Sequence, residues 1–276
     1  MKSLQLPTDL ASTVRQALKE DIGSGDLTAE LIPADKTSRA VIISREPAIL
    51  CGCAWFDEVF RQLDDATRVE WAFHDGDAIA ADVPLCNVTG HTRALLTGER
   101  TALNFLQLLS GTATTTRNYV SLLDGAHSRL LDTRKTIPGL RSAQKYAVAC
   151  GGGNNHRMGL YDAILIKENH ILAAGGIQPA VQRAKASRRR VEVEVEDLRE
   201  LEQAIAAGAD TIMLDNFTLG MIREAVLVNQ GRALLEVSGN VTQETLPELA
   251  ATGVDLISIG DLTKNVRAID FSMRIM

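Results

Sequence analysis

The chain of 276 residues is long enough for one large domain, or for two smaller ones, with a substantial core. Hydrophobic residues make up 45% and charged residues 23%, which is ordinary for a soluble globular protein. The net charge of -6 argues against a general nucleic-acid binder. The sequence shows no signal peptide and no run near the roughly 18 apolar residues of a membrane helix, so we expect a cytoplasmic protein without membrane spans.

The four cysteines do not follow a metal-binding pattern. Cys51 and Cys53 are too close together for a typical zinc pair, and no cluster of His or Cys follows them. We therefore expect reduced thiols, in keeping with a cytoplasmic protein.

The first part of the chain mixes helical and extended patterns. Residues 7–21 place their apolar side chains on one helical face, and residues 97–123 also follow a helical pattern. Residues 38–52 and 66–79 are instead typical of strands. An irregular mixture of this kind predicts an α+β domain.

After about residue 125, short apolar runs recur with helical segments between them. Two of these segments end at Gly208 and Gly253, each shortly before an Asp and the next run, which is a C-cap signal. The alternation predicts a parallel sheet, and both a barrel and an open doubly wound sheet remain possible. The predicted strands are residues 129–133, 163–167, 191–196, 211–215, 233–239 and 256–260.

Polar, charged or small residues follow five of these runs. An α/β barrel builds its active site from the carboxyl ends of its strands, although any strand must end in something polar. The residues concerned are Asp132-Thr133-Arg134-Lys135, Lys167, Asp215-Asn216, Ser238-Gly239-Asn240 and Gly260-Asp261.

The run 191–196 alternates Val and Glu, so that Glu192, Glu194 and Glu196 share one face of the strand. If the valines pack against helices, the glutamates point into a barrel. Buried carboxylates without partners would cost several kcal/mol, so cations or a metal should face them. The alternative is an antiparallel edge strand with a solvated face. We expect Glu192 to lie deeper, Glu194 to be functional and Glu196 to lie at the rim.

Positive charge is concentrated just before this run. From Arg129 to Lys167 there are seven Lys or Arg residues against two Asp. Arg and Lys bind carboxylates and phosphates, and Mg²⁺ typically takes one or two carboxylates together with substrate phosphates. The last two strands end in 238–240 and 259–261, where barrels usually bind phosphate. The residues thus indicate a phosphate-bearing substrate with Mg²⁺ and a second anionic ligand.

Segments from Glu20 to Lys264 give the chain a resemblance to the quinolinate phosphoribosyltransferase family. The family's fold would be an N-terminal α/β sandwich domain, here 1–110, and a C-terminal open α/β barrel, here 111–276, whose last residues can pack back on the first domain. The matching segments are EDIGSGDLT, GERTALNFLQLLSG, DTRKTIPGLR, KYAVACGGGNNHRMGLYDAILIKENH, VEVEVE, IMLDNF, EVSGNV and ISIGDLTK.

The resemblance also implies an activity. A family member is a glycosyltransferase (pentosyltransferase) that converts quinolinate and phosphoribosyl pyrophosphate into nicotinate mononucleotide, pyrophosphate and CO₂ in de novo NAD biosynthesis, with Mg²⁺. Two subunits of a homodimer share each active site.

The resemblance implies roles for individual residues. Arg134 and Lys135 would clamp the two carboxylates of quinolinate, with His156 and Arg157 across the pocket. Arg100 would act in trans, from the neighbouring subunit.

The catalytic residues implied in the same way are Lys135, Lys167, Glu194 and Asp215. Glu194 and Asp215 would lie near the ribose and hold the metal, and either lysine could protonate the carbanion left by CO₂. The remaining substrate-binding residues are Thr133, Ser238, Gly239, Asn240, Ile259, Gly260 and Asp261.

Three alternatives remain open at this stage. A nicotinate phosphoribosyltransferase would use a mono-acid without decarboxylation. A paralogue on the same scaffold is associated with molybdenum transport. A non-catalytic phosphosugar-binding protein would not need the carboxylate pair Glu194 and Asp215.

Overall fold

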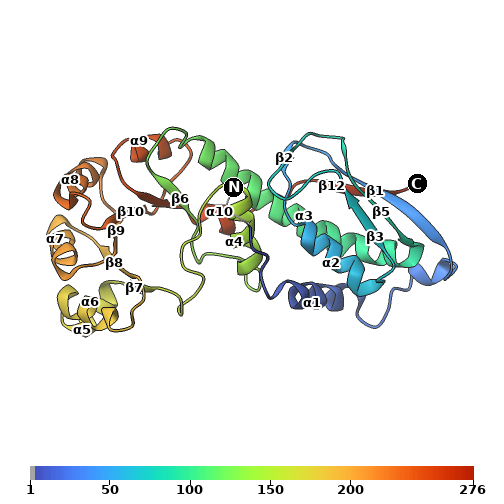
Figure 1. The fold of residues 1–276 in the computed structure, drawn as a ribbon, viewed down its shortest axis with the longest axis horizontal. Helices are drawn as coiled ribbons and strands as arrows, with labels where there is room; N and C mark the ends of the chain where they lie inside the picture. Colours follow the sequence, from blue (N-terminus) through green and yellow to red (C-terminus); the bar gives the residue numbers. More distant parts are fainter. Residues whose placement is uncertain (1–3) are drawn as a thin grey trace. The chain divides into compact units, whose positions relative to one another are not determined.

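The computed structural model describes residues 4–276, which divide into two compact units (Figure 1). The antiparallel unit contains the chain up to Arg117 together with 136–152 and 262–276, and the parallel unit contains 118–135 and 153–261. The predicted domain boundary after residue 110 falls inside one helix, α3 (Thr92–Ser121), and stays a prediction.

The antiparallel unit is built on a four-stranded sheet in the order β12-β1-β5-β3. Its aromatic core is supplied by α2, whose Trp55, Phe56 and Phe60 are fully buried because they share one helical face. The strands are β1 (Thr37–Ser44), β3 (Arg68–Trp71), β5 (Pro84–His91) and β12 (Phe271–Ile275), with β2 (Ala48–Ile49) and β4 (Ala78–Ile79) as a separate pair. The helices are α1 (Leu10–Ile22), η1 (Ala29–Leu31), α2 (Cys53–Leu63), most of α3, and α4 (Arg141–Cys150).

The parallel unit contains a six-stranded sheet in the order β6-β11-β10-β9-β8-β7. Every neighbouring pair is parallel, and no pairing of β6 with β7 is found among the described residues, so the sheet is open. The strands are β6 (Arg129–Leu131), β7 (Ile164–Ile166), β8 (Val191–Val195), β9 (Thr211–Asp215), β10 (Leu234–Ser238) and β11 (Leu256–Ser258). The helices are α5 (Glu168–Ala174), α6 (Ile177–Lys185), α7 (Leu198–Ala207), α8 (Leu219–Asn229), α9 (Leu246–Ala250) and the start of α10 (Asp261–Lys264).

All six strands predicted in this half of the chain are confirmed. The predicted C-cap at Gly208 is confirmed too, with a φ of 81° that favours glycine. Asp210 then accepts the backbone N–H of Val191 at 2.8 Å and so ties the loop before β9 to the start of β8. Three elements of the antiparallel unit, α2, β5 and β12, were not predicted from the sequence.

Strand β8 lies inside the sheet, paired with β7 on one side and β9 on the other. The edge-strand alternative is therefore wrong. Val191, Val193 and Val195 are fully buried on the face covered by α6 and α7, as predicted. The opposite face carries Glu192, which is buried, and Glu194, which is half-buried.

No helix in the part of the chain that the structure describes has the length and apolar character needed to cross a membrane.

Candidate active site

The carboxyl ends of β6 and β11 bring three predicted site residues together. A Cβ atom built on Gly260 would lie 3.1 Å from Lys135 Cδ and 3.5 Å from Thr133 Oγ1. Glycine at position 260 therefore lets the two strand ends approach closely. Ile259, the residue before it, is buried, and its backbone N–H donates to the carbonyl of Leu131 at 2.9 Å.

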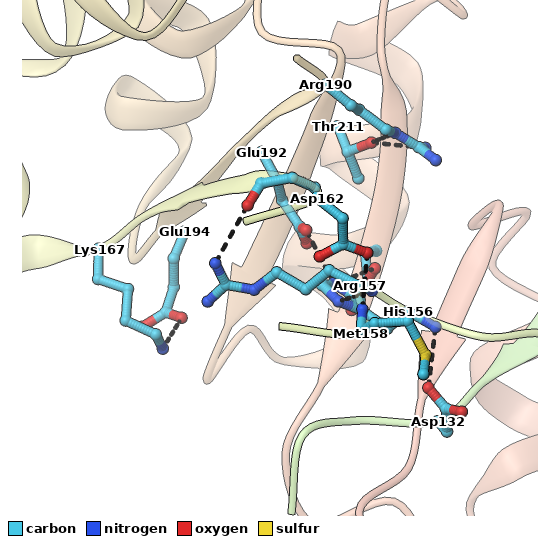
Figure 2. A network of polar contacts seen from close by, with 12 residues as sticks. Asp132, His156, Arg157, Met158, Asp162, Lys167, Arg190, Glu192, Glu194 and Thr211 are labelled. Atoms are coloured by element: carbon cyan, nitrogen blue, oxygen red, sulfur yellow. Dashed lines mark hydrogen bonds and ion pairs between the residues drawn. The ribbon is translucent and has the colours of Figure 1, made fainter. Parts of the chain in front are cut away.

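The loop that carries His156 and Arg157 is held by two carboxylates. The buried Asp132, directly after β6, accepts the backbone N–H of His156 at 2.9 Å and the Asn155 side-chain amide at 2.7 Å. Asp162 accepts the backbone N–H of Met158 at 2.7 Å (Figure 2). The loop is thus fixed on both sides of Arg157.

The guanidinium groups of Arg157 and Arg134 act on each other electrostatically. Burial, and then the positive charge of Arg134, lower the pKa of Arg157 below its ordinary value. Arg157 Nη1 donates to the carbonyl of Ala163 at 3.3 Å, while the buried Nε of Arg134 has no hydrogen-bond partner among the described residues. Two partly buried cations in this relation form a site for an anion with more than one negative group.

Glu194 on β8 forms an ion pair with Lys167, the residue after β7 (Figure 2). The Lys167 side chain is 48% exposed and the Glu194 side chain 18%, so the pair lies at the mouth of the sheet. His170 Nδ1 accepts the backbone N–H of Lys167 at 3.0 Å and thereby caps α5. His170 is a structural residue of the helix start in this arrangement.

Asp215 and the loop after β10 line the same end of the sheet. Asp215 pairs in register with Ser238, and a Cβ on Gly239 would lie 4.0 Å from Asp215 Oδ1. Asn240 has a φ of 48°, a left-handed conformation that asparagine tolerates. A cavity of about 300 Å³ is lined here by Ser238, Gly239, Asn240 and parts of β9, α8 and α9.

A buried cluster next to Arg157 was predicted only in part from the sequence. His156 Nε2 lies 2.8 Å from Glu192 Oε2 and 3.7 Å from Glu236 Oε2. Glu236, on β10, is 1% exposed, and burial followed by the charge of Glu192 raises its pKa to about 8. A lone Glu in the apolar strand 234–237 was the available signal, of the same kind as the glutamates of β8.

The cluster of His156, Glu192 and Glu236 could hold a metal ion by its ligand types, and a second such group lies in the antiparallel unit. Cys51, Asp75 and Cys150 have ligand atoms within 4.8 Å of one another. Asp75 is already engaged, however, because it accepts the backbone N–H groups of Gly52 and Cys53 and the hydroxyl of Tyr146. It orders the start of α2, and all four cysteines are free thiols, as predicted.

Two further predicted residues lie one in each unit. Arg100 is exposed on α3 in the antiparallel unit, and Asp261 is half-buried at the start of α10. A cavity of about 600 Å³ between α1, α3 and residues 137–140 of the antiparallel unit has none of the predicted site residues in its described lining. The chemistry is concentrated instead at the carboxyl ends of the parallel strands.

Comparisons with known proteins agree with this architecture. Residues 112–274 match the family model of the quinolinate phosphoribosyl transferase C-terminal domain, and residues 26–110 match that of the N-terminal domain. The chain is 43% identical over 257 residues to a probable nicotinate-nucleotide pyrophosphorylase (carboxylating) of Bacillus subtilis strain 168, covering 92% of this chain and 89% of that protein. It is 40% identical over 290 residues to the chloroplastic nicotinate-nucleotide pyrophosphorylase (carboxylating) of Arabidopsis thaliana, covering 97% and 83%.

The structural comparison gives the same result. The solved structure of the nicotinate-nucleotide pyrophosphorylase from Francisella tularensis superposes with a TM-score of 0.95 at 50% identity, over 99% of this chain and 98% of that one. The predicted fold class, α/β with an N-terminal α/β sandwich domain and a C-terminal open α/β barrel, is confirmed as an α/β protein with an antiparallel-sheet N-terminal part and a parallel six-stranded C-terminal part.

Proposed function

This chain belongs to the quinolinate phosphoribosyltransferase family, and from that membership we propose how its residues divide the work of the reaction. It is a phosphoribosyltransferase, a carboxylating nicotinate-nucleotide pyrophosphorylase of de novo NAD biosynthesis. Quinolinate and phosphoribosyl pyrophosphate give nicotinate mononucleotide, pyrophosphate and CO₂.

Quinolinate is held by its two adjacent carboxylates. Arg134 and Arg157 bind them, with Lys135 beside Arg134, because neighbouring negative groups on one ring need several fixed cations. The observation that carries this assignment is that both arginines are half-buried and that the buried Nε of Arg134 has no hydrogen-bond partner among the described residues. His156 belongs to the same loop, and its ring contacts protein groups at both nitrogens.

The phosphoribosyl group lies toward the other strand ends. Ser238, Gly239 and Asn240 border a cavity of about 300 Å³ in which backbone N–H groups can meet a phosphate. Thr133, Ile259, Gly260 and Asp261, at the ends of the neighbouring strands β6 and β11, are the further residues that we assign to phosphoribosyl binding.

Transfer begins as the bond between C1 of the ribose and pyrophosphate breaks. Positive charge develops on the ribose, and Glu194 and Asp215 stabilise it and order the ribose hydroxyls. Lys167 stabilises the departing negative charge. The ring nitrogen of quinolinate then bonds to C1 and becomes cationic.

Decarboxylation follows from that cationic nitrogen. It withdraws electrons from the adjacent carboxylate carbon, so that CO₂ leaves and the electron pair stays on the ring. Lys135 or Lys167 supplies the proton that ends the reaction. The substrate is its own electron sink, and no redox cofactor enters.

Mg²⁺ fits the carboxylates of Glu194 and Asp215. Both are hard oxygen donors at the open end of the sheet, and glycine at 239 leaves space beside Asp215 Oδ1 that a Cβ would reduce. When bound there, the ion would offset charge on the pyrophosphate.

The assembly we propose is a cytoplasmic homodimer in which Arg100 of one subunit completes the quinolinate site of the other. Support comes from the exposure of Arg100 on α3 and from its place in the segment GERTALN.

The clamp is tested by Arg134→Lys and Arg157→Lys. Lysine keeps the charge but loses the planar, bidentate donor pair, so KM for quinolinate should rise by roughly 10- to 100-fold in each variant, while KM for phosphoribosyl pyrophosphate changes far less. Initial rates at varied concentrations of each substrate give both constants.

Arg199→Lys is the matched control, because the Arg199 side chain is 78% exposed on α7. Equal rises of both KM values in the two test variants, or no rise for quinolinate, would remove the arginines from the clamp.

A further inference from the structure

The carboxylates beneath Arg157 have no part in the reaction proposed above. We propose that Glu192 and Glu236 are positioning residues that hold His156 as its neutral Nε2–H tautomer, so that His156 fixes the backbone of Arg157. This inference rests on the proposed function in one respect, namely that Arg157 binds a substrate carboxylate.

The tautomer follows first from the other ring nitrogen. The backbone N–H of Arg157 lies 2.8 Å from His156 Nδ1 and donates to it. A backbone N–H can only donate, so Nδ1 must present a lone pair and carry no proton. In a neutral imidazole the proton then resides on Nε2.

Two carboxyl groups lie close to Nε2. Glu192 Oε2 lies at 2.8 Å and Glu236 Oε2 at 3.7 Å, and the two side chains come from β8 and β10, on either side of β9. Glu192 is 6% exposed and Glu236 1%. A buried carboxylate oxygen opposite Nε2 stabilises a proton on that nitrogen.

Two buried carboxylates this close cannot both remain charged at low cost. Burial and the charge of Glu192 raise the pKa of Glu236 to about 8, so Glu236 holds its proton near neutral pH. Asp132 accepts the backbone N–H of His156, and Arg157, which follows the ring in the chain, has the charge of Arg134 near it. Glu192 Oε2, at 2.8 Å, therefore remains the nearest acceptor opposite Nε2.

The role of His156 changes as a result. An imidazole with Nδ1 bonded to a backbone N–H and Nε2–H bonded to Glu192 could pair with a substrate carboxylate only by giving up one of these bonds. A metal ion on His156, Glu192 and Glu236 would equally require the proton to move to Nδ1, against the N–H of Arg157. The geometry therefore makes His156 a structural support for the backbone of Arg157, and not a third cation or a metal ligand.

Nitrogen NMR of the full-length protein, labelled with ¹⁵N-histidine and free of substrates, reads the tautomer directly. His156 is assigned as the signal lost in His156→Gln. We expect two well-separated ring-nitrogen shifts from about pH 6 to 8, with Nδ1 unprotonated and Nε2 protonated. Averaged imidazolium shifts, or a proton on Nδ1, would overturn the proposal.

A pair of substitutions tests the consequence for Arg157. Asparagine at 156 can place its side-chain oxygen near the position of Nδ1 and keep an acceptor for the Arg157 N–H, whereas glutamine places its amide near Nε2 and loses that acceptor. KM for quinolinate should rise roughly tenfold more in His156→Gln than in His156→Asn, with a smaller change in kcat. Equal rises in two folded variants, or a larger rise in His156→Asn, would contradict it.

The tautomer of His156 and the proposed reaction can be disproved independently of each other. The NMR shifts of the substrate-free protein test the tautomer whether or not the protein turns over quinolinate. Absence of turnover by the parent protein would instead remove the proposed reaction and leave the tautomer standing.

Discussion

Arg157 is held in position before any ligand binds, mainly by hydrogen bonds from its neighbouring backbone N–H groups to two carboxylates. Asp132 holds the backbone before it and Asp162 the backbone after it, while the carbonyl of Ala163 accepts from its guanidinium. The entropy of ordering this long side chain is thus lost in folding rather than in binding, which favours affinity.

The raised pKa of Glu236 can be tested by measuring the stability of the protein against pH. The folded-state pKa of about 8 lies above the ordinary value of 4.5, so between these values the folded state holds a proton that the unfolded state has released. Stability should then fall as pH rises through this window, by at most about 1.4 kcal/mol per pH unit, and level off above it.

Glu236→Gln removes that contribution because an amide does not titrate. Urea unfolding of parent and variant at several pH values should show the variant gaining on the parent from about pH 5 to pH 8. A stability difference that stays constant over the whole range would contradict the raised pKa.

Only part of the site could be predicted from the sequence at the level of single residues. The alternation in β8 was enough to predict that Glu192 and Glu194 face inward and that the valines face helices. It could not predict that Glu236, two strands away, would meet the same histidine, because that depends on how strongly the sheet curves. The role of His156 depends on one backbone N–H, which leaves no mark in the sequence.

At the scale of elements, the parallel unit was the more predictable half. Its strands are short continuous apolar runs that end in polar residues, and each pairs with a neighbour close in the chain, apart from β6. In the antiparallel unit, β12 pairs with β1 across most of the chain length. Such pairings depend on tertiary contacts that local patterns do not reveal, whereas the apolar face of α2 was visible in the sequence.

The contact between the ends of β6 and β11 makes Gly260→Ala informative. The new Cβ would lie 3.1 Å from Lys135 Cδ, so the lysine must shift, while the backbone at 260 is not in the left-handed region. We expect kcat/KM to fall roughly tenfold or more with stability changed by less than about 1 kcal/mol.

Gly220→Ala in α8 is the matched control, because its nearest neighbour is 3.9 Å away, at Thr218 Oγ1. Alanine favours a helix over glycine, so this variant should keep full activity. Parental activity in Gly260→Ala would show that Lys135 does not need its observed position.

For the whole molecule, the question is which subunit of the proposed dimer supplies Arg100 to a given active site. Arg100→Ala and Lys135→Ala should each be inactive alone. If Arg100 acts in trans, a randomly exchanged mixture contains hybrid dimers with one intact site, and should recover about one quarter of the parental activity. No recovery, once mass spectrometry has verified subunit exchange, would place Arg100 in its own subunit's site.

The most direct measurement for the whole account is the balance of products. The protein is supplied with Mg²⁺, phosphoribosyl pyrophosphate and carboxyl-labelled quinolinate, and labelled CO₂ and nicotinate mononucleotide are followed together, with nicotinate as a parallel substrate. We expect one CO₂ for each nucleotide from quinolinate and no turnover of nicotinate, because the paired arginines require a di-acid. Nucleotide formed from nicotinate, or no turnover of quinolinate by folded protein, would contradict the account.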